Sequence, residues 1–331
     1  MTAAYGSAQL CNIGPTPRAP RGDAVNFQDP QPRDVPQIRR SWPRQRRILD
    51  RDCALLRGEQ RTLARAFVFA ALLVWPSGVW AADCPARTDA IETDRPDTTN
   101  SSLVIPYGSL QMENGINWAV RQGSQILDGS ETRVRLGVYR CGEVLVDVPN
   151  YFAAFHGLAS SGLSDLVVSV KRQLFVEQRS FSLSAVGGLG FPVSGKSSGK
   201  RVYSPYIQFP WSRTIVEDWS LNGMLTVTWS TAHDANSPNV EPTLVVERGF
   251  GSQGDFFVEY IGDYKTRNRP SEIIDVGGGW HVTRRQQLDF HIGVWLTRSS
   301  PDHYVGVGYS FRVDSLFGED VWARHASPRK R

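Results

Sequence analysis

The sequence has no apolar segment long enough to cross a bilayer as a helix. The apolar run Ala66–Trp75 contains ten residues, whereas a transmembrane helix needs about 20. Cysteine is also scarce, with four residues in a chain of 331. These two absences exclude a helical membrane span and a fold that depends on many disulfides.

Residues 1–56 lack the apolar periodicity of a folded domain. They are rich in Arg, Pro and Gln, and such a segment buries too little apolar surface to offset the entropy cost of ordering. We expect a disordered leader here. Much of the excess behind the net charge of +4 sits in this leader and in a basic tail, residues 313–331. The charge therefore gives little support for nucleic-acid binding.

Residues 57–81 have the layout of a secretory signal peptide. Three arginines precede the apolar run, a Pro-Ser-Gly sequence breaks it, and the segment ends on the small residue Ala81. We predict cleavage after Ala81 and export through the inner membrane. A signal peptide normally begins a chain, so we expect translation to start near residue 56 rather than at Met1. The alternative is a buried core helix of a cytoplasmic protein.

The residues from Asp255 to Phe311 alternate in polarity over four successive segments. In one of them Leu288, Phe290 and Ile292 alternate with Asp289 and His291. A period of two places alternate side chains on opposite faces of a sheet. The pattern predicts four strands with one apolar face and one polar face.

Eight segments upstream follow the same rule, which gives about 12 strands of the length that a tilted strand needs to cross a bilayer. These segments are Leu110–Val120, Arg133–Tyr139, Glu143–Phe152, Asp165–Phe175, Phe181–Phe191, Val202–Trp211, Trp219–Trp229 and Val240–Phe250.

The connections between these segments alternate in length. Those after even-numbered strands are short, as at Cys141–Gly142, whereas most of those after odd-numbered strands are longer and rich in Gly, Ser, Asn and Pro, as at Thr231–Asn239. Outer-membrane barrels show this alternation, with short periplasmic turns and longer extracellular loops. A soluble sandwich has no reason to sort its turns by length, and a lipocalin-like barrel would turn its apolar face inward.

The fold class that follows is all-β, an antiparallel transmembrane β-barrel over residues 109–312. Residues 82–108 are expected to form a periplasmic segment before it. Aromatic side chains support this topology because they fall at the strand ends on the apolar face. Membrane barrels carry aromatic residues there, in one belt at each membrane–water interface. Those at the expected periplasmic ends are Trp211, Trp219, Phe250, Phe256, Trp280 and Phe311, and those at the outer ends are Trp118 and Trp229.

Two cysteines, Cys84 and Cys141, follow the expected cleavage site. An even number of cysteines suits an oxidising compartment. The topology places the turn at Cys141 on the periplasmic side, next to the segment that carries Cys84. We therefore predict a disulfide between them that ties this segment to the barrel rim. Asp83 precedes Cys84, so the small residue that a lipoprotein signal needs is missing.

A sequence motif begins at Thr93, Asp94, Arg95, Pro96 and Asp97, continues with Gly108, Leu110, Gln111, Glu113 and Gly115, and returns as Gly162, Leu163, Ser164 and Asp165. Over residues 92–311 the chain resembles the family called putative MetA-pathway of phenol degradation. The resemblance implies an outer-membrane transporter-like barrel of a Gram-negative bacterium that acts as a passive channel, with aromatic compounds as candidate solutes. Such barrels usually end on an aromatic residue that the barrel-assembly machinery reads, whereas 20 residues follow Phe311 here.

The polar face is expected to line the lumen, with Glu113, Lys171, Glu247, Glu259, Asp275, His281, Asp289 and His291 as lumen-facing candidates. A three-residue turn, Arg284–Gln286, would pair His281 with Asp289 and so cluster both with His291 near the periplasmic end. This cluster could be a weak divalent-metal site or a pH-sensitive constriction. It could equally be polar residues that satisfy one another in a wet lumen, and we assign no metal and no cofactor.

An outer-membrane lipid hydrolase is the enzymatic alternative to the channel. Such an enzyme needs a serine beside an oriented histidine near the outer rim. His281 and His291 are expected to point into the barrel, which argues against this alternative, and we expect no enzyme.

Thr93–Asp97 is expected to cap the rim rather than to enter the lumen as a partial plug. The Gly- and Ser-rich run Ser194–Lys200 lacks the strand-to-helix context of a phosphate-binding loop and is expected to be an ordinary loop.

The sequence thus predicts a channel or transporter-like barrel in the cell outer membrane for passive passage of small solutes, with aromatic or hydrophobic compounds as candidates. The alternative is a non-conducting structural or adhesive barrel. The expected partners are outer-membrane lipid, the barrel-assembly machinery and a small solute of unknown identity, with no nucleic acid.

Overall fold

The computed structural model describes residues 84–121, 123–155, 160–177, 180–193, 202–229, 238–265, 269–297 and 303–316. The expected leader, signal peptide, its cleavage site after Ala81, and most of the C-terminal tail lie outside these residues. The first strands are β1 (Leu110–Arg121), β2 (Ser124–Tyr139), β3 (Gly142–Val148), β4 (Tyr151–Phe155), β5 (Gly162–Leu163), β6 (Leu166–Glu177) and β7 (Phe181–Phe191). The remaining strands are β8 (Ser204–Val216), β9 (Trp219–Thr228), β10 (Asn239–Gly249), β11 (Gly254–Lys265), β12 (Ser271–Thr283), β13 (Gln286–Trp295) and β14 (His303–Val313).

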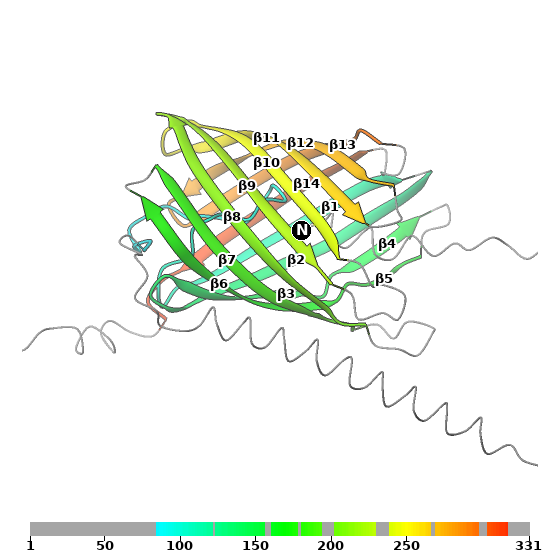
Figure 1. The fold of residues 1–331 in the computed structure, drawn as a ribbon, viewed down its shortest axis with the longest axis horizontal. Coiled ribbons are helices and arrows are strands. Elements are labelled where there is room, and N and C mark those ends of the chain that lie inside the picture. Colours follow the sequence, from blue (N-terminus) through cyan, green and yellow to red (C-terminus); the bar gives the residue numbers. More distant parts are fainter. Residues whose placement is uncertain are drawn as a thin grey trace, which may run out of the picture.

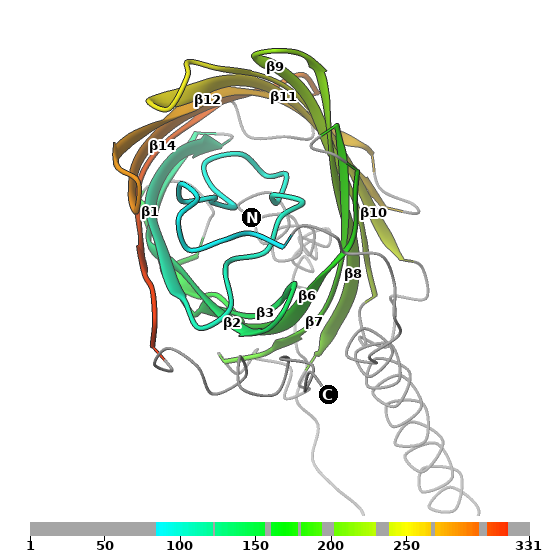
Figure 2. The same cartoon turned by 90° about the vertical axis from the view of Figure 1, so that its left-hand side faces the viewer.

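The strands close into one antiparallel barrel (Figures 1 and 2). The first strand closes it by pairing with both β2 and β14. The short strands β4 and β5 continue β3 and β6 beyond an interruption around Pro149 and Ser164, because β4 pairs with the first part of β2 and with β5. The wall therefore has twelve strands, and the predicted fold class is confirmed. No helix in the described part of the chain combines the length and apolar character needed to span a membrane.

The barrel is apolar outside and polar inside. Along β13, the outward side chain of Phe290 is 51% exposed while the inward neighbours Asp289 and His291 are 5% and 2% exposed. The same alternation runs along β1, where Glu113 and Gln111 are fully buried and Ile116 is half exposed. An outer apolar surface and a closed ladder without free edges are what a lipid bilayer requires of a sheet.

The second strand is longer than the sequence pattern predicted. It begins at Ser124 rather than at Arg133, so the expected long loop after β1 is a two-residue turn instead. A bulge explains the difference: β2 skips Ser130 in its pairing with β1, and this residue has a positive φ of 61°. The bulge shifts the phase of the side chains, and a strict period of two could not be followed across it.

The other connections keep the predicted alternation of short turns and longer loops. One strand boundary differs, because β8 continues to Val216 instead of ending at Trp211. The following turn is therefore Glu217–Asp218, and Ile215 and Val216 lie on an exposed hairpin end.

The segment Cys84–Ser109 precedes β1 and lies inside the barrel, as the cyan chain within the ring of strands in Figure 2 shows. We call it the lumen segment. Its residues Asp94, Thr98, Asn100 and Ser102 are buried. The prediction that Thr93–Asp97 caps the rim is wrong, since the motif lies in the lumen and contacts the inner wall on several sides.

Candidate functional site in the barrel lumen

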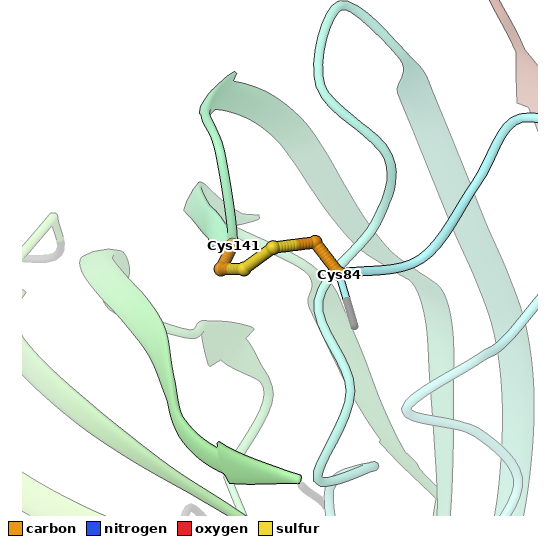
Figure 3. The surroundings of a disulfide bond; sticks show 2 residues. All are labelled: Cys84 and Cys141. Carbon is orange, nitrogen blue, oxygen red and sulfur yellow. A yellow bond between two sulfur atoms is a disulfide. The ribbon is translucent and has the colours of Figure 1, made fainter. Parts of the chain in front are cut away.

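The lumen segment is fixed at both ends near the turns between β2 and β3 and between β12 and β13. At its start Cys84 forms a disulfide with Cys141, with 5.1 Å between the Cα atoms (Figure 3), and the backbone N–H of Ile91 donates to the carbonyl of Arg284 at 2.7 Å. At its end the N–H of Gly108 donates to Gly137 O at 2.8 Å. The predicted cysteine pair is therefore joined in the structure.

Asp94 is the most densely contacted residue of the lumen segment. Its Oδ2 accepts from Arg133 Nη1 at 2.9 Å, and its Oδ1 lies 3.2 Å from Lys171 Nζ and 3.4 Å from Arg135 Nη1. The Asp94 side chain is fully buried. One carboxylate thus connects the lumen segment to cations on β2 and β6.

The same three cations also bind carboxylates of the wall. Arg133 Nε donates to Asp147 at 2.7 Å, and Arg135 contacts both carboxylate oxygens of Glu143, at 2.8 and 3.2 Å. Arg135 Nη1 also donates to Glu113 at 3.0 Å. Two-pronged contacts of this kind fix the guanidinium geometry, so this side of the lumen is rigid before the lumen segment is considered.

Arg95 connects the lumen segment to two further wall strands, β2 and β13. Its Nη1 donates to Glu131 at 2.9 Å and its Nη2 to Asp289 at 3.3 Å. The guanidinium lies where a Cβ would stand on Gly115, and a Cβ on Gly308, its partner across β1 and β14, would meet the Asp289 carboxylate and Arg95 Nε. The two glycines therefore provide the space that Arg95 occupies.

The remainder of the lumen segment binds the wall through neutral donors. The backbone N–H groups of Thr98 and Thr99 donate to the two oxygens of Glu259 at 2.8 and 2.9 Å. Asn100 donates to Gln208 at 2.9 Å, and Ile105 N–H donates to Glu143 at 2.9 Å. Contacts therefore reach β3, β8 and β11 as well as β2 and β6.

His291 belongs to a buried network on the inner wall. Its Nδ1 lies 2.9 Å from Asp275 Oδ2, and its Nε2 lies 2.9 Å from Asn117 Oδ1. The hydroxyl of Tyr304 donates to the same Asp275 oxygen at 2.8 Å. This arrangement positions the imidazole by hydrogen bonds to Asp275 on β12 and Asn117 on β1, and Tyr304 on β14 holds Asp275 in place.

The predicted cluster of His281 with Asp289 and His291 is wrong in its register. In the structure His281 pairs with Gln287, Asp289 with Gly279, and His291 with Gly277. The turn contains two residues, Arg284 and Arg285, and a bulge between His281 and Thr283 restores the phase that a three-residue turn was expected to keep. His281 instead lies beside the backbone oxygen of Ser252, at 3.2 Å.

No group of three or more His, Cys, Asp or Glu side chains in the described residues is arranged to hold a metal ion. The acidic candidates are instead divided among different partners. Asp289 binds Arg95, Asp275 binds His291, and Glu247 accepts from Asn222 at 2.6 Å.

Electrostatics differ between neighbouring residues of the lumen segment. Burial alone would raise the pKa of Asp94, but Arg135, Lys171 and Arg133 outweigh it and lower the pKa below its usual value. Burial together with Glu259, Glu247 and other nearby carboxylates raises the pKa of Asp97 well above its usual value. The two aspartates of one motif therefore face opposite charge environments.

The sequence pattern placed Glu113, Lys171, Glu259, Asp275, Asp289 and His291 on the inner face, where the structure also has them buried. It did not single out Arg133, Arg135 and Glu143, which take part in the ion pairs around Asp94 and Lys171. The sequence could have indicated them, because they occupy the inward-facing positions of β2 and β3, where charged residues are concentrated. What they bind could not be read, because Asp94 lies in a segment without strand periodicity.

The lumen segment is held mainly by hydrogen bonds and ion pairs, and it also buries the side chains of Ile91, Val104 and Ile105. The lumen segment therefore adds both polar and apolar contacts to the interior of the barrel.

Comparison with known proteins gives one matching family and several solved structures of similar fold. A family model described as putative MetA-pathway of phenol degradation matches residues 93–313. An outer membrane channel from Pseudomonas putida F1 has a similar fold, with a TM-score of 0.51 at 11% identity over 70% of this chain and 100% of that chain.

Two further structures resemble the barrel more distantly. A KdgM porin in complex with disordered oligogalacturonate gives a TM-score of 0.41 at 10% identity, over 61% of this chain and 98% of that chain. The CymD monoaromatic hydrocarbon channel gives 0.40 at 8% identity, over 64% of this chain and 90% of that chain. No curated protein sequence matches the chain.

Proposed function

The chain belongs to the family described as putative MetA-pathway of phenol degradation, and from this premise we propose that it is an outer-membrane channel or transporter-like barrel for passive passage of small solutes. The observation that carries the proposal is the closed barrel with a polar, charged inner face and an apolar outer face. A wall of this kind isolates water from lipid. Aromatic or hydrophobic compounds are the solute class that the family description supports.

A second candidate function rests on the lumen segment. Because this segment binds β2, β3, β6, β8 and β11 at once, a barrel that keeps it permanently in place would conduct little. The protein would then be a structural or adhesive barrel of the outer membrane. The two functions differ in one measurable property, the conductance of the intact protein.

Single-channel recording in planar bilayers tests the choice. We expect the purified full chain to give discrete conductance steps that neutral sugars of increasing size, or aromatic acids, reduce in turn. Repeating the recording with a variant that lacks residues 85–108 measures how much the lumen segment restricts the current. If neither protein conducts, the channel is refuted and the structural barrel is favoured.

Export and assembly complete the proposal. We propose that cleavage after Ala81 releases a chain that begins shortly before Cys84, and that outer-membrane lipid and the barrel-assembly machinery are its partners, without nucleic acid. Mass determination of the N-terminus of the purified protein tests the cleavage site. We propose no enzymatic role, and a lipase assay with and without calcium checks this directly.

A further inference from the structure

The inner wall carries its negative charge on one side. The inward positions of β10, β11 and β12 hold six carboxylate residues, which we call the acidic track: Glu241, Glu247, Asp255, Glu259, Asp263 and Asp275. On β11 the members are four residues apart, which corresponds to steps of about 13 Å along the strand. The track therefore runs most of the height of the barrel.

The acidic track has few cations of its own. Among the described residues, Lys265 binds Asp263 at 3.1 Å, and His291 lies beside Asp275. Glu247, Asp255 and Glu259 are held by neutral donors, as where Gly279 N–H donates to Asp255 at 3.0 Å. No lysine or arginine of the described part of the chain forms an ion pair with Glu247 or Glu259.

Two features of the track show carboxyl groups without a compensating cation. Glu241 is 3% exposed, and its buried Oε2 has no hydrogen-bond partner among the described residues. Glu259 and Asp275 stand directly opposite each other on β11 and β12, where like charges repel. A buried carboxylate oxygen without a donor is costly unless another positive or polar group reaches it.

The opposite wall is close to neutral. There Arg133, Arg135 and Lys171 are matched by Asp94 and by wall carboxylates. Over the whole described chain, nine Asp and Glu residues are buried against four Lys and Arg residues. The interior is therefore acidic although the full sequence carries a net charge of +4.

We propose that the acidic track makes this channel select cations, including small organic cations, over anions. The inference rests on the proposed channel function and adds the sign of the permeating charge. A passage lined by one sign of charge in a low-dielectric wall concentrates the opposite ion and excludes the same sign. Burial raises the pKa of Asp97 in the lumen segment, and the nearby carboxylates Glu259, Glu247, Asp255 and Asp275 raise it further.

The reversal potential across a bilayer with a potassium chloride gradient tests the inference on the full chain. We expect a potential of the sign that means potassium permeates faster than chloride. A current without this preference, or with preference for chloride, overturns the inference and leaves the channel function standing. The absence of any current refutes the channel function and the inference together.

Two variants and a matched control locate the effect. Glu247→Gln and Asp255→Asn remove charge from the track without touching the contacts of the lumen segment, and we expect each to shift the reversal potential toward zero. Glu272→Gln removes the same charge from β12, where Glu272 accepts from the hydroxyl of Tyr260 away from the track, and should leave the potential unchanged. Equal shifts in all three variants would contradict a role for the track.

Discussion

At the scale of the residue, Asp94 links the lumen segment to the wall. Its carboxylate meets Arg133, Arg135 and Lys171 at 2.9 to 3.4 Å, and no other residue of the segment reaches as many cations in the described structure. Each cation also keeps a wall carboxylate, so the wall is ordered independently and Asp94 adds the connection.

Replacement of Asp94 by Asn tests this connection. The variant keeps the size of the side chain but loses its charge, and the buried cations lose one partner. We expect the folded state to lose roughly 3 kcal/mol, the lower end of the range for a broken buried ion pair, because each cation retains another carboxylate. The shift of the unfolding temperature on heat-modifiability gels measures the loss, and Asp89→Asn, at an exposed position, serves as the control.

The difference in stability between the wild type and Asp94→Asn should change with pH in a defined direction. The pKa of Asp94 is lowered in the folded state, so its stabilising contribution is present above the ordinary aspartate pKa and is lost as the pH falls through the lower folded value. The wild type and Asp94→Asn should therefore differ most near neutral pH and converge in strong acid. A difference that grew on acidification would contradict the assignment.

At the scale of the element, β2 is a wall strand that binds the lumen segment through both side chains and backbone. It carries Arg133 and Arg135, and its Gly137 exchanges backbone hydrogen bonds with Gly108 and Ser109. A Cβ on Gly137 would collide with the carbonyl oxygen of Pro106. The backbone of the segment can approach the strand only because this position has no side chain.

Gly137→Ala is expected to push the end of the lumen segment away from β2. The clash is with backbone, which cannot turn aside as a flexible side chain does, and overpacking of this kind costs about 1 to 3 kcal/mol. Protease cleavage within residues 84–109 measures the displacement. The control is Gly129→Ala on the same strand, where an added Cβ meets nothing within 4 Å. The protease should cleave this variant at the wild-type rate, and faster cleavage of both variants would mean a general weakening of β2.

The elements also show where sequence patterns reach their limit. The period of two identified the strands from β6 to β14 because their alternation is nearly continuous. It failed at the bulges of Ser130 and of His281–Thr283, where one extra residue changes the phase. A bulge depends on the pairing of two strands, and this pairing is absent from a local pattern.

At the scale of the whole molecule, the disulfide and the lumen segment form a closed loop within the barrel. Cys84 and Cys141 are 57 residues apart in sequence, and the loop contains the lumen segment, β1 and β2. The covalent bond keeps the start of the segment at the turn between β2 and β3 even when its polar contacts open. It therefore limits how far the segment can leave the lumen.

Cys84→Ser is expected to free the start of the lumen segment. Closing a long loop in the unfolded chain typically stabilises a protein by about 2 to 5 kcal/mol, so the variant should unfold at a lower temperature and, as a channel, show longer or larger open events. Recordings of the wild type with and without reductant give the same comparison without mutation. An unchanged current in both experiments would show that the polar contacts alone hold the segment.

The sequence by itself determined the architecture of this protein. Alternation between apolar and polar residues, strand lengths and turn lengths are local properties, and a bilayer allows one way to satisfy them, a closed barrel with its apolar face outward. The inward phase of Glu113, Lys171, Glu259 and His291 followed from the same rule.

Only the tertiary structure decided what fills that barrel. The lumen segment has no periodicity, and its partners lie between 19 and 228 residues away along the chain, as for Asp94 with Glu113 and Arg87 with Ser315. Which charges meet depends on barrel closure bringing β1, β2, β6 and β13 around one axis. The division of the lumen into a neutral wall and an acidic track comes from the same closure, because net charge records how many charges a chain has and not where the fold places them.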